Sequence, residues 1–156
     1  MGLQEILDEM NRRLKTDVFT LDDQRSCCLS VNGGPIVEIL EFPKEGRVLL
    51  CAVLGPEPVE GKAEFYRLLM RAMYLFKDTL GCTFSLDPAT DFICLQRTDF
   101  LERLTPDSFY SLFEGFCSLA DNWNGMLDDF RPALEAAVAL KRKTDGDLSS
   151  GGFLQA

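Results

Sequence analysis

Histidine is absent from this 156-residue chain, and its absence excludes several kinds of active site. Ser-His-acid and Cys-His catalysis in their usual forms need an imidazole, which is also the commonest zinc ligand. The glycines form neither a GxxxxGK phosphate loop nor a GxGxxG dinucleotide turn. We therefore expect a protein that binds no cofactor and no metal.

The residues that remain for chemistry are paired acids and cysteines. Asp22-Asp23 and Asp128-Asp129 are adjacent pairs, which are typical of solvated loops and helix ends, whereas an acid and a base must converge in one pocket. The six cysteines contain no CxxC pair, and most fall in apolar runs, where a free thiol packs as a small hydrophobic group. We expect reduced core thiols and no enzymatic activity.

Long apolar runs and positive charge are also scarce. The longest strongly apolar run, 48–54, is far below the roughly 20 residues of a membrane span. The first residues carry acids instead of the basic start of a signal peptide. With 16 basic and 25 acidic residues, the net charge of −9 disfavours nucleic acid and anionic membranes as main partners. The sequence predicts a cytoplasmic protein.

Hydrophobic periodicity predicts a single α+β domain over residues 1–143. The expected order is α-β-β-β-α-β-β-α, a twisted antiparallel sheet packed with helices. The predicted helices are 3–14, 62–80 and one that begins at Thr105-Pro106-Asp107; the predicted strands are 26–32, 35–42, 47–54, 82–86 and 92–96. Strand 47–54 is apolar almost without alternation, which predicts that both of its faces are covered.

The C-terminal region is predicted from its breakers and its composition. Pro132 is expected to end or kink the last long helix, with a short further helix over 133–143. Residues 144–156 contain Ser149-Ser150-Gly151-Gly152 and are predicted to be a disordered tail.

The predicted helix 62–80 is apolar over an arc of roughly 260° at 100° per residue. A helix between one sheet and water needs an apolar stripe nearer 100° wide. A twofold homodimer would cover the surplus, since a self-complementary patch needs only one surface; a helix enclosed within the monomer is the alternative. The residues predicted for the dimer interface are Leu69, Ala72, Met73, Phe76 and Leu80.

Several segments together resemble the class I type III secretion chaperones, the family that includes the Tir chaperone. The resemblance covers about residues 1–130. It rests on Leu3-Gln4-Glu5-Ile6-Leu7, Cys28-Leu29-Ser30-Val31-Asn32, the sheet segment 48–55, the stretch 65–87 with Phe84-Ser85-Leu86-Asp87, and the closing helix 109–127 with its Trp123.

The resemblance implies a cytoplasmic homodimer built on the second helix. Its partner would be the N-terminal segment of a secreted effector, which winds around the dimer in extended form and stays soluble and export-competent. No nucleotide would be hydrolysed, and transfer to the secretion ATPase would be a separate docking event.

A partner segment held in this way would place apolar side chains in grooves and pair its backbone with a strand edge. The residues predicted for the effector-binding groove are Leu3, Ile6, Leu7, Met10, Leu14, Leu29 and Val31, and ordinary core packing is the alternative for each. Two other functions stay open at this stage. One is an interaction or regulatory module of the same fold without a secretion role, and the more distant one is a small carboxylate-dependent enzyme.

Overall fold

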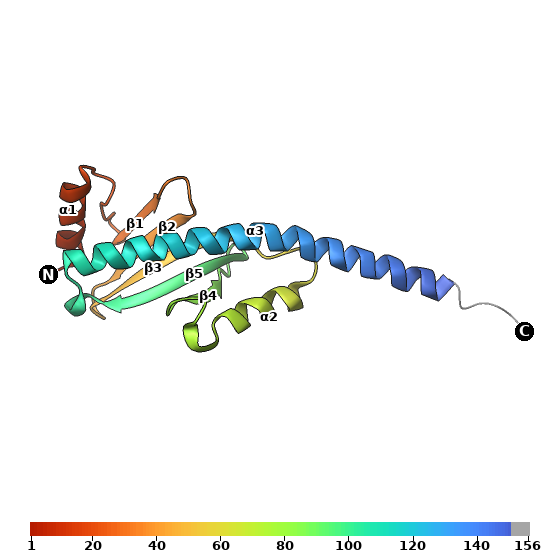
Figure 1. The fold of residues 1–156 in the computed structure, drawn as a ribbon. Helices are drawn as coiled ribbons and strands as arrows, with labels where there is room; N and C mark the ends of the chain where they lie inside the picture. Colours follow the sequence, from red (N-terminus) through yellow and green to blue (C-terminus); the bar gives the residue numbers. More distant parts are fainter. Residues whose placement is uncertain (151–156) are drawn as a thin grey trace, which may run out of the picture.

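The computed structural model describes residues 1–150, with side chains described through residue 146. It is an α+β fold in which helices pack on an antiparallel sheet (Figure 1). The predicted element order is confirmed, with two short 3-10 turns added. The elements are α1 Leu3–Leu14, β1 Ser26–Ser30, β2 Ile36–Phe42, β3 Arg47–Pro56, α2 Lys62–Ala72, η1 Tyr74–Phe76, β4 Thr83–Leu86, β5 Phe92–Phe100, η2 Leu101–Arg103 and α3 Pro106–Ser150.

The five strands lie in the order β1-β2-β3-β5-β4, so β1 and β4 are the two edges. All pairings are antiparallel. Figure 1 shows α3 crossing the sheet, with α1 at one end and α2 near β4. No helix among the described residues combines the length and the apolar content of a membrane span.

The core lies between one face of the sheet and the helices. Helix α3 contributes a stripe with alternating spacings of three and four residues, which is one face of a helix: Phe109, Phe113, Phe116, Ala120, Trp123 and Leu127. Opposite this stripe, β3 contributes its alternate side chains, among them Leu50, Ala52 and Leu54.

The prediction that strand 47–54 is covered on both faces is wrong. Its burial alternates strictly, with Leu49, Cys51 and Val53 only half-buried between fully buried neighbours. The described helices pack on the other face, so these apolar side chains line an open face of the sheet. Apolar composition alone could not tell which face the helices would cover.

Helix α2 ends at Ala72 instead of continuing to Leu80 as predicted. Leu75, Phe76 and Leu80 adopt left-handed backbone conformations with φ near +50°, which cost about 1–2 kcal/mol each for residues with a Cβ. A tertiary contact fixes this segment: the indole of Trp123 donates to the backbone oxygen of Asp78 at 3.0 Å. The same segment buries Thr79 and Cys82.

Pro132 does not end helix α3, and residues 133–143 continue the same helix instead of forming the predicted short further helix. Arg131 fixes this part of the helix to β3, because its Nε donates to the oxygen of Pro56 and its Nη2 to that of Leu54. One turn later, the side chain of Leu134 packs against Gly61.

The helix also includes residues 144–150, which belong to the segment predicted to be disordered. Residues 151–156 of that segment lie outside the described residues. Figure 1 shows the last turns of α3 extending beyond the rest of the fold.

We expect Trp123→Phe to lower the free energy of unfolding by about 1–3 kcal/mol, because the Asp78 oxygen loses its donor. The phenylalanine ring keeps a contact with Phe84, which meets Trp123 edge to face at 4.9 Å. Urea denaturation of both proteins measures the difference. An unchanged midpoint would show that this hydrogen bond does not hold the segment after α2.

Candidate functional site

A pocket of about 360 Å³ lies where α1, β1 and α3 meet. Its residues come from the end of α1, the connectors on either side of β1, and one face of α3. They are Leu14, Phe19, Val31, Asn32, Tyr110, Phe113, Glu114, Cys117, Ser118 and Asp121. We call this the α1–α3 pocket.

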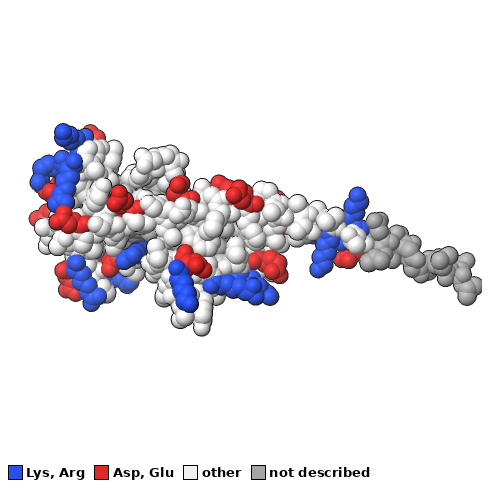
Figure 2. Space-filling view, viewed as in Figure 1, with Lys and Arg blue, Asp and Glu red and all other residues white. Residues whose placement is uncertain are grey.

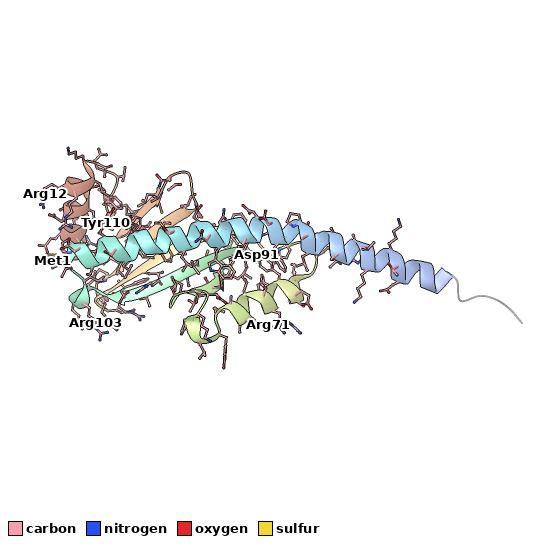
Figure 3. The ribbon with its side chains drawn as sticks, in the orientation of Figure 1. Met1, Arg12, Arg71, Asp91, Arg103 and Tyr110 are labelled. Atoms are coloured by element: carbon pink, nitrogen blue, oxygen red, sulfur yellow. The ribbon has the colours of Figure 1, made fainter. Side chains whose placement is uncertain are left out.

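The walls of the α1–α3 pocket are held by specific contacts. Asn11 on α1 fixes the connector through two hydrogen bonds with the backbone of Phe19, at 2.8 and 3.0 Å. The Phe19 ring meets Phe113 edge to face at 5.5 Å. Figure 3 shows Tyr110 near the start of α3, beside α1. Because its walls are anchored in this way, the pocket is preformed.

The free edge of β1 runs into this pocket through Val31. Glu41 N–H donates to Arg25 O, and by antiparallel alternation the N–H and C=O of Cys28 and Ser30 point away from β2. The outward backbone groups of Ser26 are already paired with Asp22: Ser26 N–H donates to Asp22 Oδ1, and Asp22 N–H donates to Ser26 O. An extended peptide could therefore pair with β1 from Cys28 onward and place a side chain in the pocket.

The second edge strand, β4, is less open. The backbone N–H of Phe84 already donates to Met73 Sδ at 3.2 Å. Side chains of α2 and β4 enclose a smaller cavity of about 170 Å³. The two sheet edges thus differ, and β1 is the better one for strand addition.

The residues predicted for the effector-binding groove divide into two groups. Four of them lie on α1 and are fully buried in the core: Leu3, Ile6, Leu7 and Met10. Their side chains present no surface to a partner in this conformation, because the inner stripe of α1 packs on the sheet and α3. Leu14 and Val31 line the α1–α3 pocket, and Leu29 is half-buried beside the core.

Most other residues of the pocket were not predicted. Tyr110, Glu114, Cys117 and Asp121 are spaced by four, three and four residues, so they share one face of α3. That spacing could have revealed them in the sequence. Phe19 and Asn32 lie in connectors, where no periodic pattern marks a wall of a pocket.

The residues predicted for the dimer interface also divide. Leu69 and Ala72 are buried within the chain and Met73 is half-buried, whereas Phe76 and Leu80 are exposed. The exposed apolar residues around the end of α2 form what we call the α2 patch: Met70, Tyr74, Leu75, Phe76 and Leu80. In Figure 2 an uncharged protrusion marks this end of α2.

Charge distinguishes the pocket from the α2 patch. Glu114 and Asp121 lie among the pocket's residues, so its lining is acidic as well as apolar. No group of three or more metal-ligating side chains occurs in the part of the chain that the structure describes. The pocket is therefore better suited to an apolar segment with basic neighbours than to an acidic one.

Comparison with known proteins identifies the family. A model of the Tir chaperone protein (CesT) family matches residues 5–124, well over half of the chain. The chain belongs to the Tir chaperone family. The matched range includes the pocket, the edge of β1 and the α2 patch, and it ends before the projecting part of α3. No curated protein sequence matches this Tir chaperone family member.

Solved structures share the fold of this family member. A chain of the ExsC–ExsE complex is 21% identical with a TM-score of 0.69, and the match covers 81% of this chain and 97% of that one. A chain of the HopA1–SchA chaperone–effector complex is 15% identical with a TM-score of 0.65, and the match covers 79% of this chain and 93% of that one. A chain of the ExoU–SpcU complex of Pseudomonas aeruginosa is 14% identical with a TM-score of 0.60, and the match covers 80% of this chain and 93% of that one. At these identities the likeness concerns the fold.

Cys117 provides a test of the pocket in this family member. Burial raises the pKa of its thiol to about 11, so at pH 8 only about one thiol in a thousand is ionised. We expect iodoacetamide to alkylate Cys117 at least tenfold more slowly than a cysteine in a short peptide, as followed by peptide mass spectrometry. Alkylation at the rate of the peptide would show that the pocket is not formed in solution.

Proposed function

We propose that this Tir chaperone family member is a type III secretion chaperone. It holds the N-terminal chaperone-binding segment of a secreted effector in extended form and keeps it soluble and export-competent, without nucleotide hydrolysis. The observation that carries the proposal is the free edge of β1 leading into the preformed α1–α3 pocket. Backbone pairing at the edge would supply affinity, and the pocket would select side chains.

Two further observations support this function. HopA1–SchA, whose fold this chain shares, is a complex of a chaperone with an effector. The α1–α3 pocket and the α2 patch both expose apolar surface. The net charge of −9 makes copies of the protein repel one another, which limits nonspecific association through that surface. We also propose that the protein acts in the cytoplasm, where effectors are made.

The binding mode has an energetic requirement. Ordering an unfolded segment costs about 2–5 kcal/mol or more, and such interfaces bury about 1,000–3,000 Å². One pocket of about 360 Å³ holds only a few side chains, so the segment must continue along β1 and over further apolar surface. The open face of the sheet supplies such surface through Leu40, Leu49 and Val53.

We expect Leu14→Glu combined with Val31→Glu to abolish effector binding, because two added negative charges would face apolar side chains of the effector in the pocket. The tagged protein is purified from its native cell, and mass spectrometry identifies what remains bound. Met126→Glu is the matched control, since Met126 is half-exposed and lines neither cavity. Circular dichroism checks that each variant is folded.

The wild type and the control should retain a secreted protein that the double variant loses. Hydrogen exchange of the complex should show protection of the Cys28 and Ser30 amides. A bound partner that is never secreted would favour the interaction-module hypothesis instead. Binding that survives the double variant would place the site elsewhere on the fold.

We also propose that the protein is a homodimer joined through the α2 patch. Tyr74 and Leu75 are 71% and 64% exposed in the single chain, and exposed apolar patches mark association sites. A twofold contact would cover both copies of the patch at once. The predicted residues Phe76 and Leu80 belong to this patch, whereas Leu69 and Ala72 would support it from inside the chain.

We expect Tyr74→Glu combined with Leu75→Glu to give a folded monomer, because four like charges would meet at the twofold interface. Sedimentation equilibrium should give twice the chain mass of 17.5 kDa for the wild type and one chain mass for the variant. Val18→Glu, at an exposed position on the connector after α1, should remain dimeric. A dimer that persists in the double variant would assign the interface to another surface.

A further inference from the structure

The open face of the sheet carries two cysteines on its central strands. Cys51 on β3 is opposite Gln96 of β5, and Cys94 of β5 is opposite Val53. Cys51 and Cys94 are therefore diagonal neighbours on the same face. The described helices pack on the other face of the sheet, and Cys51 remains partly exposed.

The surroundings of the two sulfurs differ. Hydrogen bonding from the Cys94 thiol is the main influence on Cys51 and lowers its pKa to about 7. Gln96 Nε2 adds a second donor at 3.7 Å from Cys51 Sγ. The same contact with Cys51, followed by burial, raises the pKa of Cys94. The two pKa values shift in opposite directions, so Cys51 is the more readily ionised thiol, and the Cys94 thiol also lies 3.9 Å from the backbone oxygen of Phe92.

Acidic neighbours do not reverse this arrangement. Glu38 is opposite Cys51 on β2, and its charge, like that of Asp87, raises the pKa of Cys51. Both effects are smaller than the hydrogen bonds from Cys94 and Gln96. Burial is the main influence on three other cysteines and raises the pKa of each: Cys27, Cys82 and Cys117.

We propose that Cys51 and Cys94 form an oxidation site that reacts with peroxides. The Cys51 thiolate attacks one oxygen of hydrogen peroxide, the O–O bond breaks, and hydroxide leaves, so that Cys51 becomes a sulfenic acid. The Cys94 sulfur then attacks Cys51 Sγ, and the sulfenic oxygen leaves as water with the Cys94 proton. In sum, two thiols and one peroxide give one disulfide and two waters.

The expected rate follows from two opposing effects. At pH 7 about half of Cys51 is ionised, against about one in a hundred for a thiol at the reference value of 9.0. A thiolate whose pKa is lower by two units is also about eightfold less nucleophilic, at a Brønsted slope near 0.45. The net expectation is oxidation about sixfold faster than that of an ordinary cysteine.

Sheet geometry sets a cost on closing the bond. Diagonal neighbours in a regular antiparallel pair have Cα atoms about 7–8 Å apart, beyond the usual 4.4–6.8 Å of a disulfide. The pairing of β3 with β5 is irregular between Val53 and Gly55, next to Cys94. Closing the bond requires the two strands to shift toward each other. A bond closed by such a shift is strained and therefore easily reduced.

The experiment treats the fully reduced, full-length protein with hydrogen peroxide at pH 7. We expect the loss of two thiols, a mass lower by about 2 Da, and a peptide that joins Cys51 to Cys94. Cys94→Ser should stop at a sulfenic acid on Cys51, which dimedone captures. Cys51→Ser and Cys51→Ala should form no bridge and should lose the faster oxidation expected of Cys51. Two substitutions are tested so that the result does not depend on the folding of one variant.

Cys28→Ser is the matched control, because Cys28 is an exposed cysteine on the same face of the sheet. It should oxidise like the wild type. The proposal is wrong if the wild type forms no bridge between Cys51 and Cys94. A disulfide between two chains, or an unchanged rate in both Cys51 variants, would also overturn it.

Discussion

The packing of α3 across one face of the sheet determines most other features of this protein. Its stripe from Phe109 to Leu127 meets the alternate side chains of β3. Trp123 then fixes the segment after α2 through Asp78, and Arg131 fixes the end of β3. Because one helix makes all these contacts, the positions of α1 and α2 are linked through it.

One-sided packing has consequences for function. A sheet covered by helices on a single face keeps an open face and a free edge, and soluble proteins rarely leave such surface without a partner. Here the β1 edge leads into the α1–α3 pocket, the α2 patch lies near the opposite edge, and the open face holds the Cys51–Cys94 pair. The α2 patch is separate from the β1 edge, whereas a partner segment that continued over Leu49 and Val53 would also cover the Cys51–Cys94 pair.

The cysteine thiols differ in pKa because their surroundings differ. Cys117 in the pocket is half-buried, and partial burial raises the pKa of its thiol because it disfavours the thiolate. The pKa of Cys51 is lowered because Cys94 and Gln96 donate toward its sulfur. Sequence spacing showed neither difference, since the partners of both thiols come from strands and helices distant in the chain.

The sequence by itself determined the order of elements, the family and the absence of histidine chemistry, because periodicity, turn residues and composition are local properties. It also predicted Leu14 and Val31 for a binding groove, and both line the α1–α3 pocket. The end of α2, the continuation of α3 past Pro132 and the burial of the α1 stripe were decided by tertiary structure. In each case contacts distant in the sequence were decisive: Trp123 fixes Asp78 in the segment after α2, Arg131 joins the helix beside Pro132 to β3, and α3 covers side chains that periodicity could only assign to an apolar face.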